Sequence, residues 1–271
     1  MHADWLIPDW PAPVGVRAVF TSRQGGVSAP PYDSLNLGDH VGDEQQRVQA
    51  NRERLCQAMG AHAVFLKQVH GTDVITLDSD TPDGQQADAC VTTRRQLACT
   101  IMVADCLPVL LCTEDGAVVA AAHAGWRGLA GRTGREGGDG VLEAVYKRFS
   151  ALAEEKSAQA AIKTIAYLGP CIGPTAFEVG AEVKAAFEAT QSGAGSQFAA
   201  LAGGKYLANL PGLARQRLQA LGITRIYGND GSAPWCTVGN PSRFFSHRRD
   251  AGVDGNGFYT TGRMAACIWI G

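Results

Sequence analysis

The chain has 271 residues, of which 45% are hydrophobic and 18% charged, enough apolar material for a sizeable core. Its 24 lysines and arginines are balanced by 26 acidic residues, so we expect no basic face for nucleic acid and no polybasic tract for a membrane surface. No apolar run reaches the roughly 18 residues of a membrane span, and eight cysteines are too few for a disulfide framework in a chain of this length. We therefore expect a cytoplasmic enzyme with free thiols.

Short runs of β-branched and apolar residues, bounded by turn-forming residues, predict strands along the whole chain. In chain order they are Val16–Thr21, Ala63–Val69, Asp73–Leu77, Leu97–Val103, Val109–Cys112, Ala117–Ala122, Ile162–Leu168, Ile223–Tyr227 and Met264–Ile270.

Fewer segments show the apolar spacing of helices. The four predicted helices begin at or just after Asp43, Asp139, Phe177 and Asn209. Asp43 and Gln46 resemble a capping box for the first helix, which stops at Gly60. Because strands outnumber helices and do not alternate with them regularly, we expect an α+β fold rather than a doubly wound one.

Two segments lack any apolar period and are predicted to be loops. Gly131–Gly140 contains five glycines, and Gln191–Gly204 is rich in glycine, alanine and serine. Neither is long enough to mark a domain boundary, so residues 1–271 are predicted to form one domain.

The segment Ala104–Gly128 predicts a hairpin, because Asp115-Gly116 stands between two apolar runs. If these two residues form the loop, Cys106 is a diagonal neighbour of His123 on the same face of the sheet. A loop at Glu114-Asp115 would place Cys106 directly opposite His123. Either register brings the two side chains to about 5–8 Å between Cβ atoms, whereas a three-residue loop would put them on opposite faces.

His70 ends a further apolar run and is followed by Gly71, so it too is expected at the end of a strand. Two imidazoles and one thiolate form an accepted catalytic zinc set, which leaves a fourth position for water or substrate. The hairpin supports the pair Cys106 and His123 but says nothing about His70. The alternatives are a buried structural thiol and ordinary hydrogen-bonded histidines.

Ten segments in a fixed order resemble the YfiH family, also called the laccase-domain or polyphenol oxidase family, from about residue 17 to the C-terminus. They are RQGGVS (Arg23–Ser28), PYDSLNLGDHVGD (Pro31–Asp43), NRERL (Asn51–Leu55), KQVHG (Lys67–Gly71), ADCLPVLL (Ala104–Leu111), HAGWRG (His123–Gly128), LGPCIGP (Leu168–Pro174), FEVG (Phe177–Gly180), FFSHRRD (Phe244–Asp250) and TGR (Thr261–Arg263).

The resemblance implies that His70, Cys106 and His123 bind Zn²⁺, with Cu²⁺ as the alternative metal, and that Cys106 is part of the catalytic site. It implies a layered α/β/β/α domain similar to cysteine-hydrolase-like toxins. The implied reaction is phosphorolysis of adenosine, inosine and methylthioadenosine to a free base and a sugar 1-phosphate, accompanied by deamination of adenosine. The expected partners are therefore a small nucleoside and phosphate.

Phosphorolysis needs cations that hold phosphate, and the fork of arginine matches phosphate oxygens. The candidates are Arg52, Arg127, Arg248 and Arg249. The resemblance favours Arg52 as a catalytic residue and Arg249 as a substrate-binding residue. A solvated surface charge, a loop anchor or a structural salt bridge would explain the same residues.

Three further residues are candidates for substrate contacts. Asn36 would hold a ribose hydroxyl or base edge, or only form a turn. Gln68, two residues before His70, would share its face on a strand, and orient a substrate or satisfy backbone groups. Trp126 would stack on a purine, although a core or loop anchor is the more common role.

The chain departs from the family pattern at two places. Gly131–Gly140 is an insertion after HAGWRG, and His247 stands where an aromatic residue is common. The zinc deaminase signature, His-x-Glu followed by Pro-Cys-x-x-Cys, is absent from the sequence. If the chain deaminates adenosine, its proton-transfer residue is therefore a different one.

Three other functions fit parts of the sequence. A copper-dependent polyphenol oxidase would use the same ligands, but no two histidines are spaced as His-x-His. A Cys–His amide hydrolase that edits peptidoglycan precursors would use Cys106 as nucleophile and His123 as base. A structural zinc module would need a fourth protein ligand.

Overall fold

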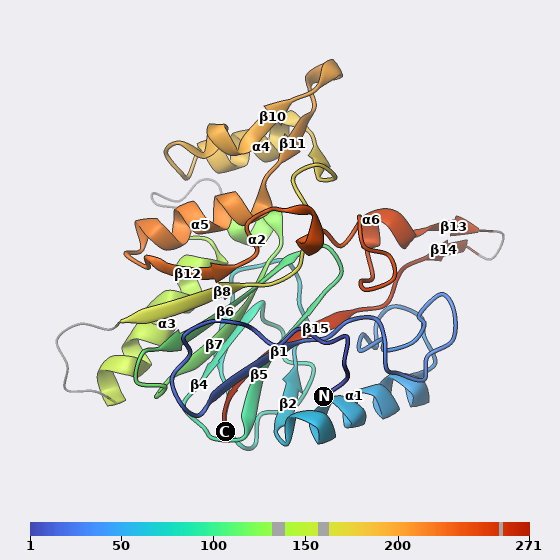
Figure 1. Ribbon diagram of the computed structural model, residues 1–271. Helices are drawn as coiled ribbons and strands as arrows, with labels where there is room; N and C mark the ends of the chain where they lie inside the picture. Colours follow the sequence, from blue (N-terminus) through green and yellow to red (C-terminus); the bar gives the residue numbers. More distant parts are fainter. Residues whose placement is uncertain (132–138, 157–162, 255–256) are drawn as a thin grey trace.

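A computed structural model describes residues 1–131, 139–156, 163–254 and 257–271 (Figure 1). It contains two mixed sheets that face each other, with helices on their outer sides. No helix in these ranges has the length and apolar character needed to cross a membrane. Residues 132–138 of the predicted insertion at Gly131–Gly140 lie outside the described residues.

The first sheet has four strands in the order β1, β15, β5, β2. Their bounds are Val16–Phe20, Met264–Ile270, Leu97–Val103 and His62–Phe65. The first three are antiparallel, and β2 runs parallel to β5. Helix α1, Gln45–Met59, covers the outer face of this sheet with Leu55 and Met59 and ends at Gly60, whose φ of 63° lies in the left-handed region that glycine tolerates.

The second sheet has six strands in the order β12, β8, β6, β7, β4, β3. Their bounds are Arg225–Gly228, Thr164–Leu168, Leu107–Thr113, Val119–Ala124, Ala89–Thr92 and Val74–Thr76. Its central pairs are antiparallel, and both edge strands are parallel to their neighbours. The inner strands are buried along their whole length, as expected of a sheet covered on both faces.

Smaller elements complete the fold. The remaining strands are β9 (Glu178–Val179), β10 (Phe198–Ala200), β11 (Tyr206–Ala208), β13 (Gly252–Asp254) and β14 (Gly257–Tyr259). The remaining helices are α2 (Trp126–Ala130), α3 (Val141–Lys156), α4 (Ala181–Glu188), α5 (Leu210–Ala220) and α6 (His247–Asp250), with 3₁₀ turns at Ala194–Gln197, Ala202–Gly204 and Ala233–Trp235.

Three apolar cores separate the layers. Ile101, Leu110 and Ile268 belong to the core between the two sheets. Phe149 of α3 and Leu213 of α5 belong to the core on the outer face of the second sheet. With the α1 core, the order of layers is helix, sheet, sheet, helices (Figure 1). The predicted mixture of strands and helices without regular alternation is confirmed.

The hairpin of β6 and β7 has the first of the two predicted registers. Pro108 lies opposite His123, so Cys106 is the diagonal neighbour of that histidine. The turn is centred on Asp115 and Gly116, where the N–H of Gly116 donates to the carbonyl of Thr113 at 3.0 Å. The two-residue turn at Asp115-Gly116 therefore sets the register.

Most predicted strands are present, with ends shifted by two residues at most. The run Ala63–Val69 is the exception, because β2 ends at Phe65 and the following residues form an irregular loop up to His70. Strand β4 was not predicted, because Ala89–Thr92 is short and follows acidic residues.

The first helix begins within two residues of Asp43, but its predicted capping box is absent, and the predicted helix start near Phe177 is wrong. The Asp43 carboxylate accepts hydrogen bonds from Ser28 and Asn36 instead of capping, and α1 begins at Gln45. Phe177 precedes the short strand β9, and α4 begins only after Gly180.

The predictions further along the chain had mixed outcomes. Gln191–Gly204 contains two 3₁₀ turns and β10 rather than a structureless loop. The cap at Asn209 is confirmed, since its side chain accepts the N–H of Gly212 at 3.1 Å.

Candidate metal centre and pocket

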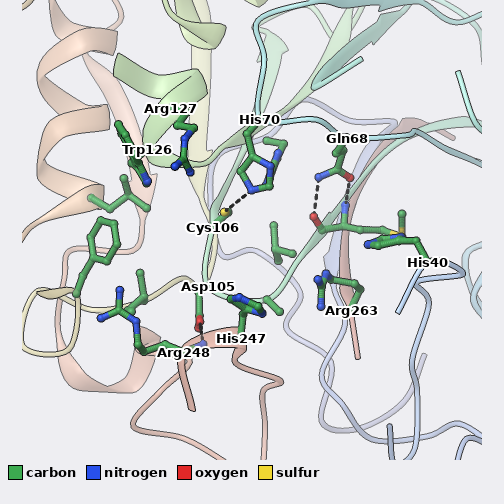
Figure 2. Close-up of a pocket in the computed structure, with 17 residues that line it drawn as sticks. His40, Gln68, His70, Asp105, Cys106, Trp126, Arg127, His247, Arg248 and Arg263 are labelled. Carbon is green, nitrogen blue, oxygen red and sulfur yellow. Dashed lines mark hydrogen bonds between the residues drawn. The ribbon is translucent and has the colours of Figure 1, made fainter. Parts of the chain in front are cut away.

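The structure brings His70, Cys106 and His123 together from three separate segments. His70 lies in the loop after β2, Cys106 immediately precedes β6, and His123 lies near the end of β7. Their potential ligand atoms are all within 4.8 Å of one another. His70 Nε2 is 3.7 Å from Cys106 Sγ (Figure 2), and the two imidazole rings are 4.7 Å apart between centroids.

The donor set fits a tetrahedral metal ion such as zinc. Zn–N bonds of about 2.0–2.1 Å and Zn–S bonds of about 2.3 Å place nitrogen and sulfur about 3.5 Å apart, and His70 and Cys106 are close to that separation. No fourth cysteine, histidine or carboxylate from the described part of the chain joins the group. This is the pattern of a site that keeps one position open.

Asp88, which was not predicted from the sequence, holds both histidines of the group. Its fully buried carboxylate accepts the backbone N–H groups of Val69 (3.1 Å), His70 (2.8 Å) and Gly71 (2.7 Å). It also lies 2.8 Å from His123 Nδ1, which turns Nε2 of that ring toward the ligand group. A lone carboxylate just before the apolar run at 89–91 was the signal in the sequence.

Backbone conformation and close packing shape the rest of the centre. His70 has a φ of 60°, a left-handed conformation that costs about 1–3 kcal/mol and that the Asp88 hydrogen bonds offset. A Cβ atom at Gly125 would lie 2.8 Å from His70 Cδ2 and 3.0 Å from Cys106 Sγ. Only glycine fits between these two residues.

The metal-free centre favours an ion pair between Cys106 and His123. Burial opposes ionisation of the thiol, but the charge and hydrogen bond of His123, with the hydrogen bond of His70, lower the pKa of Cys106 to about 6. Burial likewise opposes protonation of His123, yet Cys106 and Asp88 raise the pKa of His123 to about 9. A thiolate, the form that binds metal, is thus present at neutral pH.

The three residues lie in the wall of a pocket of about 420 Å³, a size suited to a small molecule. The pocket is lined by His40, Gln68, His70, Met102, Val103, Ala104, Asp105, Cys106, His123, Trp126, Arg127, Ile172, Phe177, Leu210, His247, Arg248 and Arg263. Figure 2 shows Arg263, His247 and Arg248 on the side of the pocket that faces Cys106 and His70.

The polar part of the pocket lining is strongly cationic. It contains three arginines, and its one carboxylate, Asp105, is already engaged. Asp105 accepts hydrogen bonds from Thr237 (2.5 Å), Ser246 (3.0 Å) and the backbone N–H of Arg248 (2.6 Å). The aromatic and aliphatic side chains of Trp126, Phe177, Ile172 and Leu210 supply an apolar part. The pocket therefore suits a ligand with an anionic end and a flat apolar end.

Arg52 and Asn36 lie outside the residues that line the pocket. Arg52 projects from α1, donates to the carbonyl of Leu37 at 3.0 Å, and is 3.2 Å from Asp39. Asn36 is fully buried, and its Oδ1 accepts the N–H of Arg263 at 2.9 Å. Both residues therefore brace the loop at 36–40.

Arg249 also lies outside the pocket lining. Its guanidinium forms an ion pair with Asp250 and donates to the carbonyls of Thr237, Val238 and Phe244. It therefore anchors α6, which carries His247 and Arg248 into the pocket.

Gln68 lines the pocket but does not share a strand face with His70, because both residues lie in the loop after β2. Its side-chain amide pairs with the backbone of Met102, with Nε2 donating to the carbonyl and Oε1 accepting the N–H, both at 2.8 Å. Trp126, Arg127 and Arg248 are in the lining, as are His40 and Arg263, which the sequence analysis did not identify. In the sequence, His40 ends the LGDH motif and Arg263 ends the TGR motif, and these two motifs were the available signals for the two residues.

Comparisons with known proteins find relatives that match nearly the whole chain. The chain is 45% identical to the purine nucleoside phosphorylase YfiH of Escherichia coli (strain K12) over 267 residues, covering 98% of both chains. It is 43% identical to the purine nucleoside phosphorylase PA4543 of Pseudomonas aeruginosa, again over 98% of both.

Solved structures also resemble this chain over nearly its whole length. Protein NMB0706 of Neisseria meningitidis matches with a TM-score of 0.84 and 42% identity, covering 98% of this chain and 99% of that one. YlmD of Geobacillus stearothermophilus matches with a TM-score of 0.82 and 29% identity, covering 100% and 97%. A family model described as multi-copper polyphenol oxidoreductase laccase matches residues 17–271. With these likenesses across nearly its whole length, the chain belongs to the YfiH family of laccase-domain proteins.

Proposed function

We propose that this chain is a zinc-dependent purine nucleoside phosphorylase that cleaves adenosine, inosine and methylthioadenosine and also deaminates adenosine. The relatives that carry the name purine nucleoside phosphorylase support the reaction class. The observation that carries the proposal is the pocket, in which a His-Cys-His group faces an arginine-rich wall without a free carboxylate.

His70, Cys106 and His123 would hold the metal, and Asp88 would orient both imidazoles. When bound, zinc supplies a Lewis acid and lowers the pKa of a water molecule toward about 7. Cys106 is thereby assigned to the catalytic centre as a ligand.

The cationic wall would bind phosphate, and the apolar wall would bind the base. Arginine forks match phosphate oxygens, and a purine ring buries well against Trp126 and Phe177. We propose that Arg52, Asn36 and Arg249 support these walls. Gln68 would fix the end of β5 through its hydrogen bonds to the Met102 backbone. The pocket takes residues from both sheets and from α2, α5 and α6, which favours one catalytic domain. We also propose that the fold is similar to that of cysteine-hydrolase-like toxins.

Product analysis of the purified zinc-loaded protein tests the function. Adenosine, inosine and methylthioadenosine are each incubated with and without phosphate, and bases and sugar phosphates are separated by chromatography. We expect free base and sugar 1-phosphate only when phosphate is present, and inosine from adenosine in either case. Release of base that does not depend on phosphate, or no turnover of any nucleoside, would contradict the proposal.

A Cys–His amide hydrolase is the second candidate, because the pKa values of Cys106 and His123 already favour a thiolate–imidazolium pair. Peptidoglycan precursor peptides are the substrates to try. Activity that survives complete metal removal and is lost on alkylation of Cys106 would favour this function. Uptake of oxygen with a phenol, in proportion to bound copper, would favour the oxidase instead.

A further inference from the structure

Arg263 is a half-buried cation whose charge has no carboxylate partner. Its Nη1 donates to the carbonyls of Thr261 (2.7 Å) and Gly262 (3.3 Å). Within the described ranges, no aspartate or glutamate oxygen lies within 4.0 Å of its guanidinium, whereas seven other arginines form such ion pairs. A guanidinium withdrawn from water and turned into a pocket attracts an anionic ligand.

The position of Arg263 is fixed by the loop at 36–40. Asn36 Oδ1 accepts the N–H of Arg263 at 2.9 Å, and the carbonyl of Arg263 accepts the N–H of Leu37 at 3.0 Å. A Cβ atom at Gly38 would lie 2.7 Å from Arg263 Cγ, so the loop backbone packs directly on the side-chain stem. The guanidinium is therefore held in place before any ligand arrives.

The same loop brings a second polar group to this end of the pocket. His40 lines the pocket together with Arg263. The residue before it, Asp39, forms an ion pair with Arg52 at 3.2 Å. Burial and the charge of Arg263 lower the pKa of His40, so at neutral pH its ring offers a neutral N–H donor. The two side chains lie at the same end of the view in Figure 2.

The other two arginines of the pocket are less suited to hold a free anion. Arg248 donates with both Nη atoms to the carbonyl of Glu178, at 3.2 and 3.1 Å. Arg127 is exposed and lies over the ring of Trp126, with its Cζ 4.4 Å from the ring centroid. Both lie nearer the apolar wall, where the proposed base would sit.

From this geometry we propose that Arg263, assisted by His40, binds the inorganic phosphate that attacks the nucleoside, and that Asn36 and Arg52 are positioning residues for this subsite. The inference rests on the proposed phosphorylase function. A phosphate oxygen forms the bond to C1′ of the ribose, and the bond from C1′ to the base nitrogen breaks with its electron pair on the base. The proton of hydrogen phosphate ends on that nitrogen, so free base and ribose 1-phosphate account for all atoms and charges.

The test compares steady-state kinetics of Arg263→Gln and the wild type at varied phosphate and varied inosine. Loss of a charge-assisted hydrogen bond predicts a phosphate KM raised by about 10- to 100-fold, with the inosine KM changed by less than about threefold. Arg263→Lys keeps the charge but loses the fork, and we expect an intermediate value. Arg54→Gln is the matched control, because this exposed arginine lies on α1 outside the pocket lining.

Asn36→Ala tests the positioning role. We expect a raised phosphate KM at nearly unchanged kcat, in a protein that still folds by circular dichroism. A folded Asn36→Ala variant with the wild-type phosphate KM would overturn the positioning role.

Further outcomes distinguish a failure of this inference from a failure of the proposed function. If the wild type releases base with phosphate and Arg263→Gln keeps the wild-type phosphate KM, this inference is wrong while the proposed function stands. If the wild type releases no base, the function itself fails. Cleavage of a nucleoside 5′-monophosphate without added phosphate, lost in Arg263→Gln, would show that the subsite holds the phosphate of the substrate and would overturn the inference.

Discussion

At the scale of single residues, one buried carboxylate organises the whole metal group. Asp88 accepts three backbone N–H groups around His70 and also contacts His123. Burial raises its pKa, but the hydrogen bond and charge of His123 and the backbone hydrogen bonds outweigh this, so the pKa of Asp88 lies below its ordinary value. An ionised acceptor at this point orients two ligands at once.

We expect Asp88→Asn to weaken zinc binding by about 10- to 100-fold, because the amide cannot accept all of these hydrogen bonds. Competition with a chromogenic chelator measures the affinity. Asp80→Asn, at an exposed aspartate in the same part of the chain, is the control. Unchanged zinc affinity in Asp88→Asn would show that the ligands are oriented by other contacts.

The pKa of Cys106 predicts the reactivity of the metal-free protein. Because this pKa falls from 9.0 to about 6, the thiolate predominates at pH 7 and is protonated only below about pH 6. The rate of alkylation by iodoacetamide is therefore expected to rise with a midpoint near pH 6 and to be suppressed by zinc. Cys106→Ser gives the background rate of the other thiols, and a midpoint near pH 9 would contradict the prediction.

At the scale of elements, the turn from β7 into α2 is as important as the ligands that flank it. Gly125 stands between His123 and Trp126, and its missing side chain leaves room for His70 and Cys106. Gly128, one turn later, packs against the carbonyl of Gly71, 2.6 Å from where its Cβ would be. The glycines of HAGWRG thus allow two loops to approach each other closely.

We expect Gly125→Ala to lower zinc affinity at least about tenfold, since the new methyl group must displace the His70 ring or the Cys106 sulfur. Metal content after dialysis against chelator measures the effect. Gly239→Ala is the matched control, because its Cβ would meet nothing closer than 3.8 Å. Equal metal retention in the two variants would mean that the turn can shift without cost.

At the scale of the whole molecule, a buried arginine ties the helical layer together. Arg217 of α5 has 4% of its side chain exposed and is 2.9 Å from Glu143 of α3. It also donates to the carbonyl of Ala130 at the end of α2 and to Thr190 after α4. Four helices are therefore linked by one side chain, close to the α2 residues that line the pocket.

Removal of this side chain leaves Glu143 without its partner, and we expect Arg217→Ala to lower the free energy of unfolding by about 3 kcal/mol. The double variant Arg217→Met/Glu143→Leu removes both charges and should recover most of that loss. Urea denaturation measures all variants, with Lys147→Ala on the exposed face of α3 as the control. A loss below about 1 kcal/mol in Arg217→Ala would show that the link is dispensable.

The family, most strands and the ends of two helices could be predicted from the sequence. For the hairpin, the sequence left two registers open, and both of them place Cys106 beside His123. These features depend on local signals, namely apolar runs bounded by turn-forming residues, the glycine at 60, the cap at Asn209 and motifs in a fixed order. Local signals could not show that the strand before His70 ends at Phe65, because the following loop is held by hydrogen bonds to Asp88, which immediately precedes β4.

The polar residues that face the pocket became apparent only from the three-dimensional packing of the chain. Asn36, Arg52 and Arg249 have the chemistry of ligand-binding residues, but their hydrogen bonds and ion pairs are made to neighbouring segments of the chain. His40 and Arg263 face the pocket because segments more than two hundred residues apart meet there, where the Arg263 backbone is hydrogen-bonded to the Asn36 side chain and to the Leu37 N–H. The direction of a side chain depends on the packing of distant segments, and no spacing within one segment records it.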